Sequence, residues 1–401
     1  MALTWSGHRP EAVQELDVPQ GKPSGSLPLS LRLGYIDGLR AIAALGVLVY
    51  HAGMAPRPGR PPDDSLLGRS FLFGAHGVDL FFVISGFCLA YPYLGRLRKT
   101  GALAFDAAEF GARRLVRILP PYYLAIAIFA IVFSALGLHS PGLTPLALVQ
   151  QVFFLDKDLS YLSNVFWTLA VELRWYVAFP FLLYAYSRAP RAFALLGIAS
   201  YALYYFTRVN AVDFGTLPAF MLGIWSADLE ITQSKLRRYA PAVGIPCLIC
   251  AFAFMSGKQY YAVQPVGVVA AFALVVSAGL FEPLRRALSL RPLVAFGVAS
   301  YSIYLFHEPV IAYAEVLHHA PLWLGASASL GLSLVFFWVC ERPFISGPLR
   351  GAMTSRLKGA LVRALAFLLG RPGVHRSATR GADADIVSNE SLSAVGQASR
   401  A

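Results

Sequence analysis

Long apolar runs recur along almost the whole chain, and they constrain its fold more than any other feature. A helix needs about 20 apolar residues to cross the hydrocarbon core of a bilayer, which is roughly 30 Å thick. Residues of the hydrophobic set make up 57% of the 401 residues and charged residues only 14%, a balance that a soluble protein surface does not tolerate. The sequence therefore predicts an all-α, polytopic membrane protein.

The breaks between apolar runs predict about ten transmembrane helices. These lie at residues 35–53, 72–93, 117–138, 166–186, 192–206, 214–229, 240–255, 262–281, 293–317 and 321–341. The runs 192–206 and 214–229 are short, so tilted, re-entrant and merged arrangements stay open for them. An even number of spans would place both termini on the same side of the membrane.

Lys and Arg are distributed unevenly between alternate connections of these ten spans. The connections on the side of the termini hold 26 of the 34 basic residues, whereas those on the other side hold 6. Because cytoplasmic loops carry an excess of Lys and Arg, we expect both termini to be cytoplasmic. The formal net charge of +12 then reflects topology, and we expect no nucleic-acid partner.

The chain divides by composition into three parts. Residues 1–34 are polar and rich in Pro, Ser and Gly, which predicts a flexible cytoplasmic tail, and residues 35–345 form the transmembrane domain. Residues 346–401 form a second cytoplasmic tail, in which a basic amphipathic stretch at 355–369 is suited to lying flat on the leaflet before disorder begins. The four cysteines fall in apolar runs, so no disulfide framework is predicted.

Ionisable side chains inside a span cost several kcal/mol, so each one is a candidate functional residue. Arg40 and His51 in the first span are eleven residues apart, which places them on nearly the same helix face, and Asp37 lies one turn before Arg40. A structural role stays open for both, with Arg40 reaching back to the cytoplasmic interface and His51 at the outer end.

Further candidates lie in the second, fourth and ninth spans. Asp79 lies near the outer end of the second span, where a helix N-terminal carboxylate is the structural alternative. Glu172 lies near the predicted depth of His51. Its neighbour Arg174 faces elsewhere, where pairing with a carboxylate on another span and binding of a donor substrate both stay open. His307 is deep within an apolar run.

Two more charged groups border the predicted spans. Arg113, Arg114 and Arg117 precede the third span on the predicted cytoplasmic side, where they can bind lipid phosphates or the phosphates of a nucleotide cofactor, which suit the fork of a guanidinium. Glu341 and Arg342 end the tenth span, where we expect an interfacial charge pair with a structural role.

Taken together, these segments resemble the type-three acyltransferase family of integral membrane proteins, whose members acylate surface polysaccharides, peptidoglycan, Nod factors and macrolide sugars. The resemblance runs from about Tyr35 to Pro343. Its elements are Arg40 and His51 with ten residues between them, Gly77-Val-Asp-Leu-Phe-Phe-Val-Ile-Ser-Gly-Phe87, Arg113-Arg-Leu-Val-Arg-Ile-Leu-Pro120, Trp167-Thr-Leu-Ala-Val-Glu172 and Ser300-Tyr-Ser-Ile-Tyr-Leu-Phe-His307. Their common order on one chain makes the signal specific, whereas Arg174 departs from the family's usual apolar or aromatic residue.

This resemblance implies a multi-pass enzyme of the cell inner (plasma) membrane that moves an acyl group, acetyl by family frequency, from cytoplasmic acyl-CoA to a hydroxyl of a sugar-containing acceptor. Acyl-CoA would be a co-substrate, with no bound cofactor and no metal. His51, an imidazole with an unperturbed pKa of about 6.5, is the candidate base, oriented by Glu172 or Asp79. The candidate donor- and substrate-binding residues are Arg40, Arg113, Arg114, Arg117, Trp167, Ser300, Tyr304 and His307.

Two alternatives follow from the same residues. Acyl transfer can be direct or can pass through an acyl group on His51, and the sequence is compatible with both. A secondary transporter or flippase also uses buried Arg, His, Glu and Asp to line a pathway. Substrate movement without acyl-CoA turnover would distinguish transport from acyl transfer.

Overall fold

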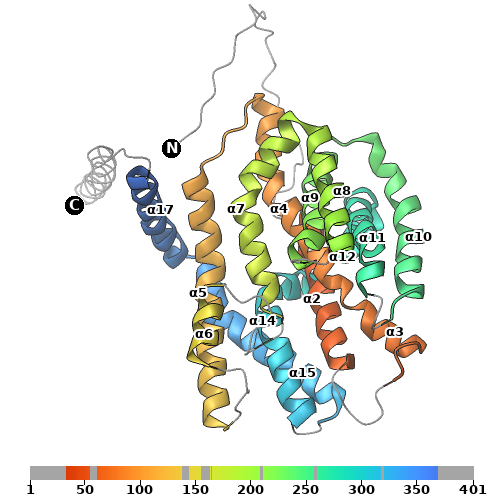
Figure 1. Cartoon of the computed structure of the whole chain (residues 1–401), viewed down its shortest axis with the longest axis vertical. Helices are drawn as coiled ribbons and strands as arrows, with labels where there is room; N and C mark the ends of the chain where they lie inside the picture. The colour runs from red at the N-terminus through yellow and green to blue at the C-terminus, as the bar shows by residue number, and fades with distance from the viewer. Residues whose placement is uncertain are drawn as a thin grey trace, which may run out of the picture.

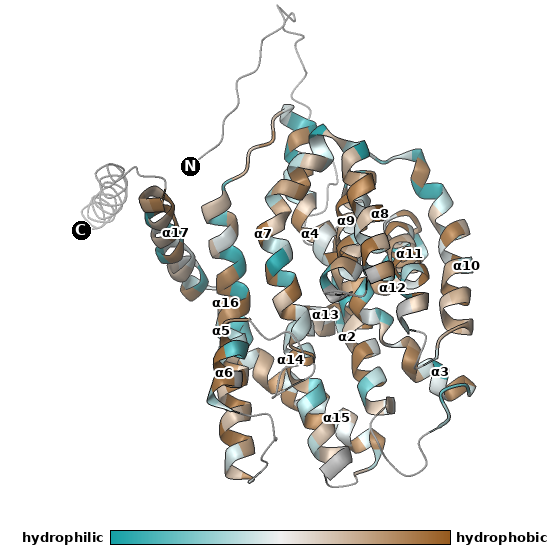
Figure 2. Cartoon of the chain, viewed as in Figure 1, coloured by the Kyte–Doolittle hydropathy of each residue, from teal (hydrophilic) through white to brown (hydrophobic). Residues whose placement is uncertain are grey.

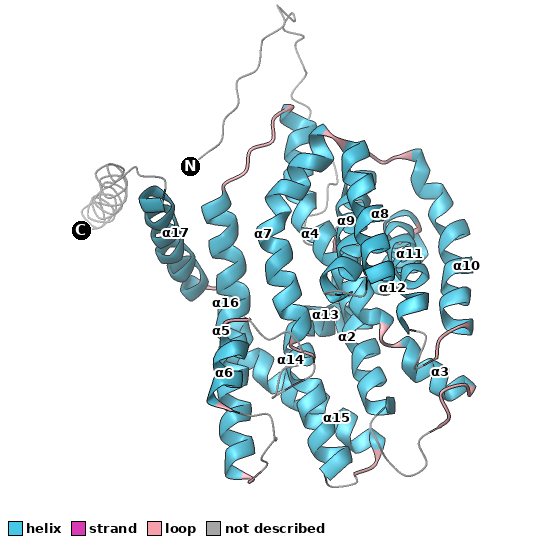
Figure 3. Ribbon diagram, viewed as in Figure 1, coloured by secondary structure: helices cyan, strands magenta, loops and turns pink. Residues whose placement is uncertain are grey.

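The computed structural model describes residues 33–54, 61–137, 144–154, 163, 165–207, 211–256, 260–317 and 320–368. Within these ranges all regular secondary structure is helical, which confirms the predicted all-α class (Figure 3). Figure 2 shows that hydrophobic residues make up much of most helices, as expected for a chain that spans a membrane. The predicted tail 1–34 and the predicted disorder after residue 369 fall almost entirely outside the described residues.

The helices follow one another along the chain as Figure 1 shows. The first half comprises α2 (Gly34–Met54), α3 (Leu66–Phe73), α4 (His76–Thr100), α5 (Ala107–Ala135), α6 (Pro145–Val152), α7 (Trp167–Arg188), α8 (Pro190–Thr207) and α9 (Ala211–Ile231). The second half comprises η1 (Lys235–Tyr239), α10 (Ala240–Ala253), α11 (Tyr260–Leu280), α12 (Glu282–Leu288), α13 (Arg291–Val298), α14 (Ser300–Ile311), η2 (Ala312–Leu317), α15 (Leu322–Phe336), η3 (Phe337–Glu341), α16 (Arg342–Ile345) and α17 (Pro348–Leu368).

Each of the ten predicted spans overlaps one or more of these helices. Six helical stretches of the described chain are long and apolar enough to cross a membrane, and the bent pair α13–α14 makes a seventh. The stretches α7, α8 and α9 are not among them; α7 carries Glu172 and Arg174, and α9 carries three acidic residues. A multi-spanning helical protein is therefore confirmed, and the count of ten and the orientation stay predictions.

Glycines bring α4 and α9 into backbone contact at the centre of the bundle. A Cβ atom added to Gly86 would lie 2.0 Å from the carbonyl oxygen of Phe220, and one added to Gly223 would lie 2.1 Å from that of Val83. Small residues permit this close approach, which increases van der Waals packing between the helices. This packing matters in lipid because the hydrophobic effect does not drive helices together there. Elsewhere on α4, Ser85 contacts Glu172 of α7 and Phe81 contacts Tyr304 of α14.

The ninth predicted span is broken where α13 meets α14, with a bend of 70°. The start of α14 therefore lies inside the bundle, and its backbone N–H groups need partners there. Glu341, which is fully buried, accepts hydrogen bonds from the backbone N–H of Ser302 at 3.0 Å and from its hydroxyl. The predicted interfacial pair of Glu341 with Arg342 is wrong, because Glu341 caps α14 and Arg342 stacks over Trp338 at 4.3 Å.

The basic helix α17 lies along the first turns of α5 (Figure 1). The ammonium group of Lys358 is 2.9 Å from Asp106 and 3.0 Å from Glu109, and Leu361 faces Gly111. The amphipathic stretch at 355–369 thus has a protein partner on α5. Its predicted contact with a lipid leaflet stays a prediction.

Candidate functional site

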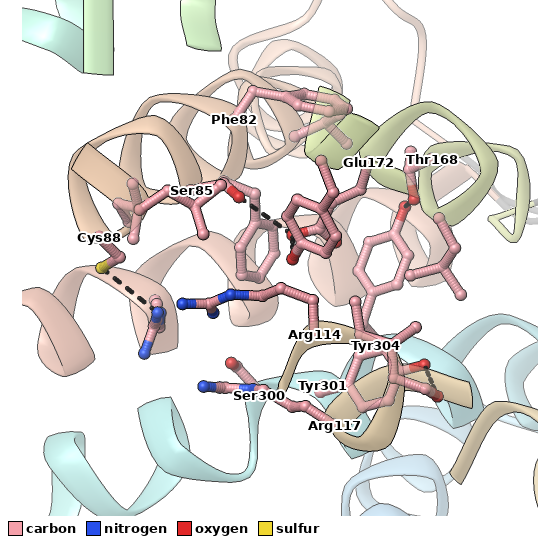
Figure 4. A pocket seen from close by; sticks show the side chains of 18 residues that line it. Phe82, Ser85, Cys88, Arg114, Arg117, Thr168, Glu172, Ser300, Tyr301 and Tyr304 are labelled. Atoms are coloured by element: carbon pink, nitrogen blue, oxygen red, sulfur yellow. Dashed lines mark hydrogen bonds between the residues drawn. The ribbon is translucent and has the colours of Figure 1, made fainter. Parts of the chain in front are cut away.

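A cavity of about 120 Å³ opens among α2, α4, α5, α7 and α14 (Figure 4). Its walls combine cationic, hydroxyl and aromatic side chains with a single carboxylate. The lining residues are Arg40, Val78, Phe81, Phe82, Ile84, Ser85, Cys88, Leu89, Arg114, Arg117, Ile118, Thr168, Leu169, Glu172, Tyr176, Ser300, Tyr301 and Tyr304. Five sequence motifs carried the family resemblance. Four of them contribute several residues each to the cavity lining, and the first contributes Arg40.

Three guanidinium groups give one end of the cavity a surplus of positive charge. Arg40 is held by Asp37 at 2.9 Å and by the Sγ atom of Cys88 at 3.4 Å. Arg114 lies over the ring of Tyr176, at 5.9 Å from its centroid. Within the described part of the chain, Arg114 and Arg117 form neither a hydrogen bond nor an ion pair. Two cations that no carboxylate binds directly, in a cavity, are suited to an anionic ligand.

The arginine triplet of the sequence divides between two helix faces. Arg114 and Arg117 are one turn apart on α5 and both line the cavity. Arg113 is exposed and pairs instead with Glu109, its Nε atom lying 2.5 Å from the carboxylate. The structure thus brings Arg40, Arg114 and Arg117 together, and it does not bring Arg113 to them.

Glu172 lies in the middle of the cavity, between the arginines and the aromatic end (Figure 4). Its Oε1 atom accepts hydrogen bonds from the hydroxyl of Ser85 at 3.0 Å and from that of Tyr176 at 2.5 Å. These two partners fix the carboxylate, and neither was among the residues selected from the sequence. Tyr176 could have been recognised from its spacing, because it lies four residues after Glu172 on the same helix face.

Asp79 lies on a different face of α4 and does not line this cavity. It is fully buried, 2.7 Å from Nδ1 of His76, and it accepts a hydrogen bond of 3.2 Å from the amide of Gln264 on α11. Neither Asp79 nor Glu172 forms a hydrogen bond with His51. The orienting contact that the sequence suggested for these carboxylates is therefore not present in the structure.

His51 is paired instead with His307. The Nε2 atom of His307 lies 3.1 Å from Nδ1 of His51, and the rings meet edge to face. The Nδ1 atom of His307 is 2.8 Å from the carbonyl oxygen of Tyr304, and that of His51 is 3.0 Å from the carbonyl oxygen of Val47. Carbonyl oxygens only accept hydrogen bonds, so each Nδ1 carries a proton in the neutral pair. The lone pair of His51 then lies on Nε2.

Tyr304 joins the cavity to this histidine pair. It lines the cavity, and its ring centroid is 5.5 Å from that of His307, one turn further along α14. Its hydroxyl donates to the carbonyl of Val165 at 3.2 Å and accepts from the hydroxyl of Thr168 at 2.8 Å. Ser300 also lines the cavity, whereas Trp167, at the first turn of α7, packs against the hydrophobic core.

Arg174 has the partner that its position suggested. Its Nη2 atom lies 2.8 Å from the carboxylate of Asp213 on α9. The prediction that Arg174 pairs with a carboxylate on another span is confirmed. Arg174 therefore acts on the packing of α7 against α9 and leaves the charge of Glu172 within the cavity unchanged. No group of three or more metal-ligating side chains occurs among the residues described.

Comparison with known proteins supports an enzymatic interpretation of this cavity. The sequence model of the acyltransferase domain family matches residues 33–342. The O-acetyltransferase OatA of Staphylococcus aureus is 24% identical over 325 residues, covering 70% of this chain and 51% of its own length. The peptidoglycan O-acetyltransferase OatA of Listeria monocytogenes is 25% identical over 323 residues, covering 69% of this chain and 49% of its own. The chain spans about half the length of these curated relatives, and no solved structure matches it.

Proposed function

Since the chain belongs to the type-three acyltransferase family, we propose that it is a membrane-bound O-acyltransferase that moves an acyl group from acyl-CoA to a hydroxyl of a sugar-containing acceptor. One observation carries this proposal. A cavity with two guanidinium groups that form no ion pair among the described residues leads to Tyr304, and Tyr304 contacts His307, the buried member of the histidine pair.

The cationic end of the cavity suits the donor. Coenzyme A carries its phosphates at one end and its thioester at the end of a long amide arm, so the two ends need different surroundings. Arg114 and Arg117 offer forked donors for phosphate oxygens, and Arg40 adds positive charge nearby. We propose ten spans in the inner (plasma) membrane with both termini in the cytoplasm. In this topology the arginines lie on the cytoplasmic side, where the cavity has access to acyl-CoA.

His51 is the proposed base. A hydroxyl is a weak nucleophile at neutral pH, so its proton must be removed as its oxygen attacks the thioester carbonyl. The Nε2 lone pair of His51 takes this proton while the C–O bond forms and the C–S bond breaks, and coenzyme A leaves as a thiolate that is then protonated. His307 accepts the hydrogen bond from Nδ1 of His51 and stabilises the imidazolium that results.

The acceptor is proposed from the relatives. Both are named O-acetyltransferases, and one name specifies peptidoglycan, which supports an acetyl group and a glycan hydroxyl for this chain. In this proposal residues 35–345 form the catalytic membrane domain and α17 belongs to a cytoplasmic segment that follows it. A flippase or transporter is the second candidate, but the histidine pair with a fixed tautomer favours proton transfer to an attacking hydroxyl.

The test is release of coenzyme A from acetyl-CoA by the purified chain in nanodiscs, with glycan acceptors added one at a time. His51→Gln is compared with Arg96→Gln, an exposed residue outside the cavity whose substitution is expected to leave the rate unchanged. Acceptor-stimulated release that disappears only in His51→Gln supports the proposal. Equal rates in folded His51→Gln protein, or transport of a labelled glycolipid without coenzyme A release, would overturn it.

A further inference from the structure

Tyr304 occupies the boundary between the cavity and the histidine pair. Its side chain is buried, with one face toward the cavity and the ring 5.5 Å from that of His307. The cavity lining includes Tyr304 and excludes both His51 and His307. If acyl-CoA enters from the cationic end, its acyl group must therefore meet Tyr304 before it can reach Nε2 of His51.

The ring of Tyr304 is fixed from two sides. Its hydroxyl is bound to Thr168, in the first turn of α7, and to the carbonyl of Val165, just before that helix, and all three residues are buried. The ring of Phe81, from α4, meets it edge to face at 5.8 Å between centroids. Rotation of Tyr304 out of the boundary would break both hydrogen bonds of its buried hydroxyl, which opposes its movement.

The side chains that line the cavity follow one another from a cationic end to an aromatic end in Figure 4. Arg114 and Arg117 extend toward one end, Glu172 lies between, and Tyr304 with Thr168 stands at the other end. A donor whose phosphates are bound by the arginines has its acyl carbon nearest Tyr304. Each methylene added to that acyl group then presses against the Tyr304 and Phe81 rings, and a packed wall resists such insertion.

We infer that Tyr304 is a specificity-determining residue that ends the acyl subsite beside the histidine pair and restricts the donor to short acyl groups. This inference rests on the proposed function, because it assumes that acyl-CoA occupies the cavity. Thr168 acts through Tyr304 as a positioning residue, since it holds the hydroxyl while the ring provides the wall.

The experiment compares acetyl-, butyryl- and octanoyl-CoA with wild-type protein, Tyr304→Leu, Tyr304→Phe and Phe129→Leu in nanodiscs. Phe129 is buried in the same aromatic cluster, against Phe306, and lies outside the cavity, so Phe129→Leu controls for general loosening. Two quantities are measured for each donor, the kcat/KM for coenzyme A release and the thermal stabilisation of the protein by the donor.

We expect wild-type kcat/KM to fall at least tenfold from acetyl- to octanoyl-CoA, a discrimination within reach of a shaped apolar wall. Tyr304→Leu should raise the octanoyl-to-acetyl ratio at least tenfold, both in kcat/KM and in the binding affinity derived from the thermal stabilisation. Tyr304→Phe should raise it less, and Phe129→Leu should leave it unchanged. The inference is overturned if wild type accepts octanoyl-CoA as well as acetyl-CoA, or if the ratio is the same in folded Tyr304→Leu and wild type.

The two readouts separate this inference from the proposed function. Donor binding that depends on chain length and on Tyr304, without acceptor-stimulated release, would contradict acyl transfer and support the acyl subsite. Acyl transfer that is indifferent to Tyr304 would support the proposed function and contradict the subsite. Absence of acyl-CoA binding to folded wild-type protein would overturn both.

Discussion

The Nε2 atom of His307 lies 3.1 Å from Nδ1 of His51, although the two residues are 256 positions apart in the chain. One is near the end of α2 and the other lies on α14, and backbone carbonyls of both helices bind the Nδ1 atoms. These carbonyls fix the tautomer of each ring, because a carbonyl oxygen requires a donor. The pair therefore presents a lone pair on Nε2 of His51, which is the state that a general base needs.

His307→Gln is expected to lower kcat about tenfold to hundredfold, a part of the 10²–10⁴-fold that general base catalysis typically supplies. The carbonyl of Val47 still holds His51 in the same tautomer in this variant. The imidazolium of His51, however, loses the imidazole of His307 that stabilises it. Steady-state kinetics with acetyl-CoA should show an unchanged KM. A KM increase with constant kcat would instead place His307 in donor binding, as the sequence suggested.

Arg114→Gln and Arg117→Gln are expected to raise the KM for acyl-CoA about tenfold or more each, since a hydrogen bond to a charged group contributes roughly 1.5–3 kcal/mol. Arg113→Gln, on the exposed face of α5, should change the KM several-fold less. Titration with acetyl-CoA and with its 3′-dephospho form would show which phosphate each arginine binds. Equal effects of all three substitutions would contradict the division between helix faces.

Gly86→Ala is expected to destabilise the protein by about 1–3 kcal/mol, because its Cβ would meet a backbone carbonyl of α9 and the helices would have to separate. Gly331→Ala is the matched control, since it lies in α15 with no atom within 4 Å of the added Cβ. Thermal unfolding in detergent should show a lower Tm only for Gly86→Ala.

Glu341→Ala is expected to lower stability by about 0.5–2 kcal/mol, the usual effect of removing a helix N-cap acceptor. Glu341→Gln keeps an oxygen for the Ser302 N–H and hydroxyl, so it should retain most of the wild-type Tm. If the two variants unfold at the same temperature, the cap is not what stabilises the start of α14.

The contact between α17 and α5 should depend on pH through Asp106 and Lys358. Burial opposes ionisation of Asp106, but the Glu109 N–H and the Lys358 ammonium outweigh it and hold the pKa of Asp106 below its ordinary value. The hydrogen bonds to Asp106 and Glu109 raise the pKa of Lys358.

A lowered carboxyl pKa stabilises the contact above the unfolded value of about 3.9, and this stabilisation is lost as the pH falls through the folded pKa. A raised Lys pKa stabilises the contact below about 10.4, and this stabilisation is lost as the pH rises through the folded pKa. Hydrogen exchange of α17, corrected for the intrinsic pH dependence, should therefore increase below about pH 4 and above about pH 10. Lys358→Met should exchange faster at pH 7 and lose this dependence, and identical exchange in both proteins would contradict the ion pair.

Much of the fold followed from local chemistry. Apolar runs predicted helices at all ten positions, because a lipid-embedded backbone must satisfy its hydrogen bonds within each segment. The sequence also identified Arg113, Arg114 and Arg117 as one basic cluster beside the membrane. It could not show that Arg113 faces away from the cavity, because the rotation of α5 against its neighbouring helices cannot be read from the sequence.

The sequence by itself determined an all-helical membrane protein, because helix period and hydropathy are properties of neighbouring residues, and its ordered motifs identified the acyltransferase family. Only the tertiary structure decided which of those residues meet. Glu172 and Asp79, which both appeared suited to His51, have Tyr176 and His76 as partners, and His51 has His307. The physical reason is that contacts between helices depend on their crossing and rotation, which the packing of α2, α4, α7 and α14 sets and which no local pattern records.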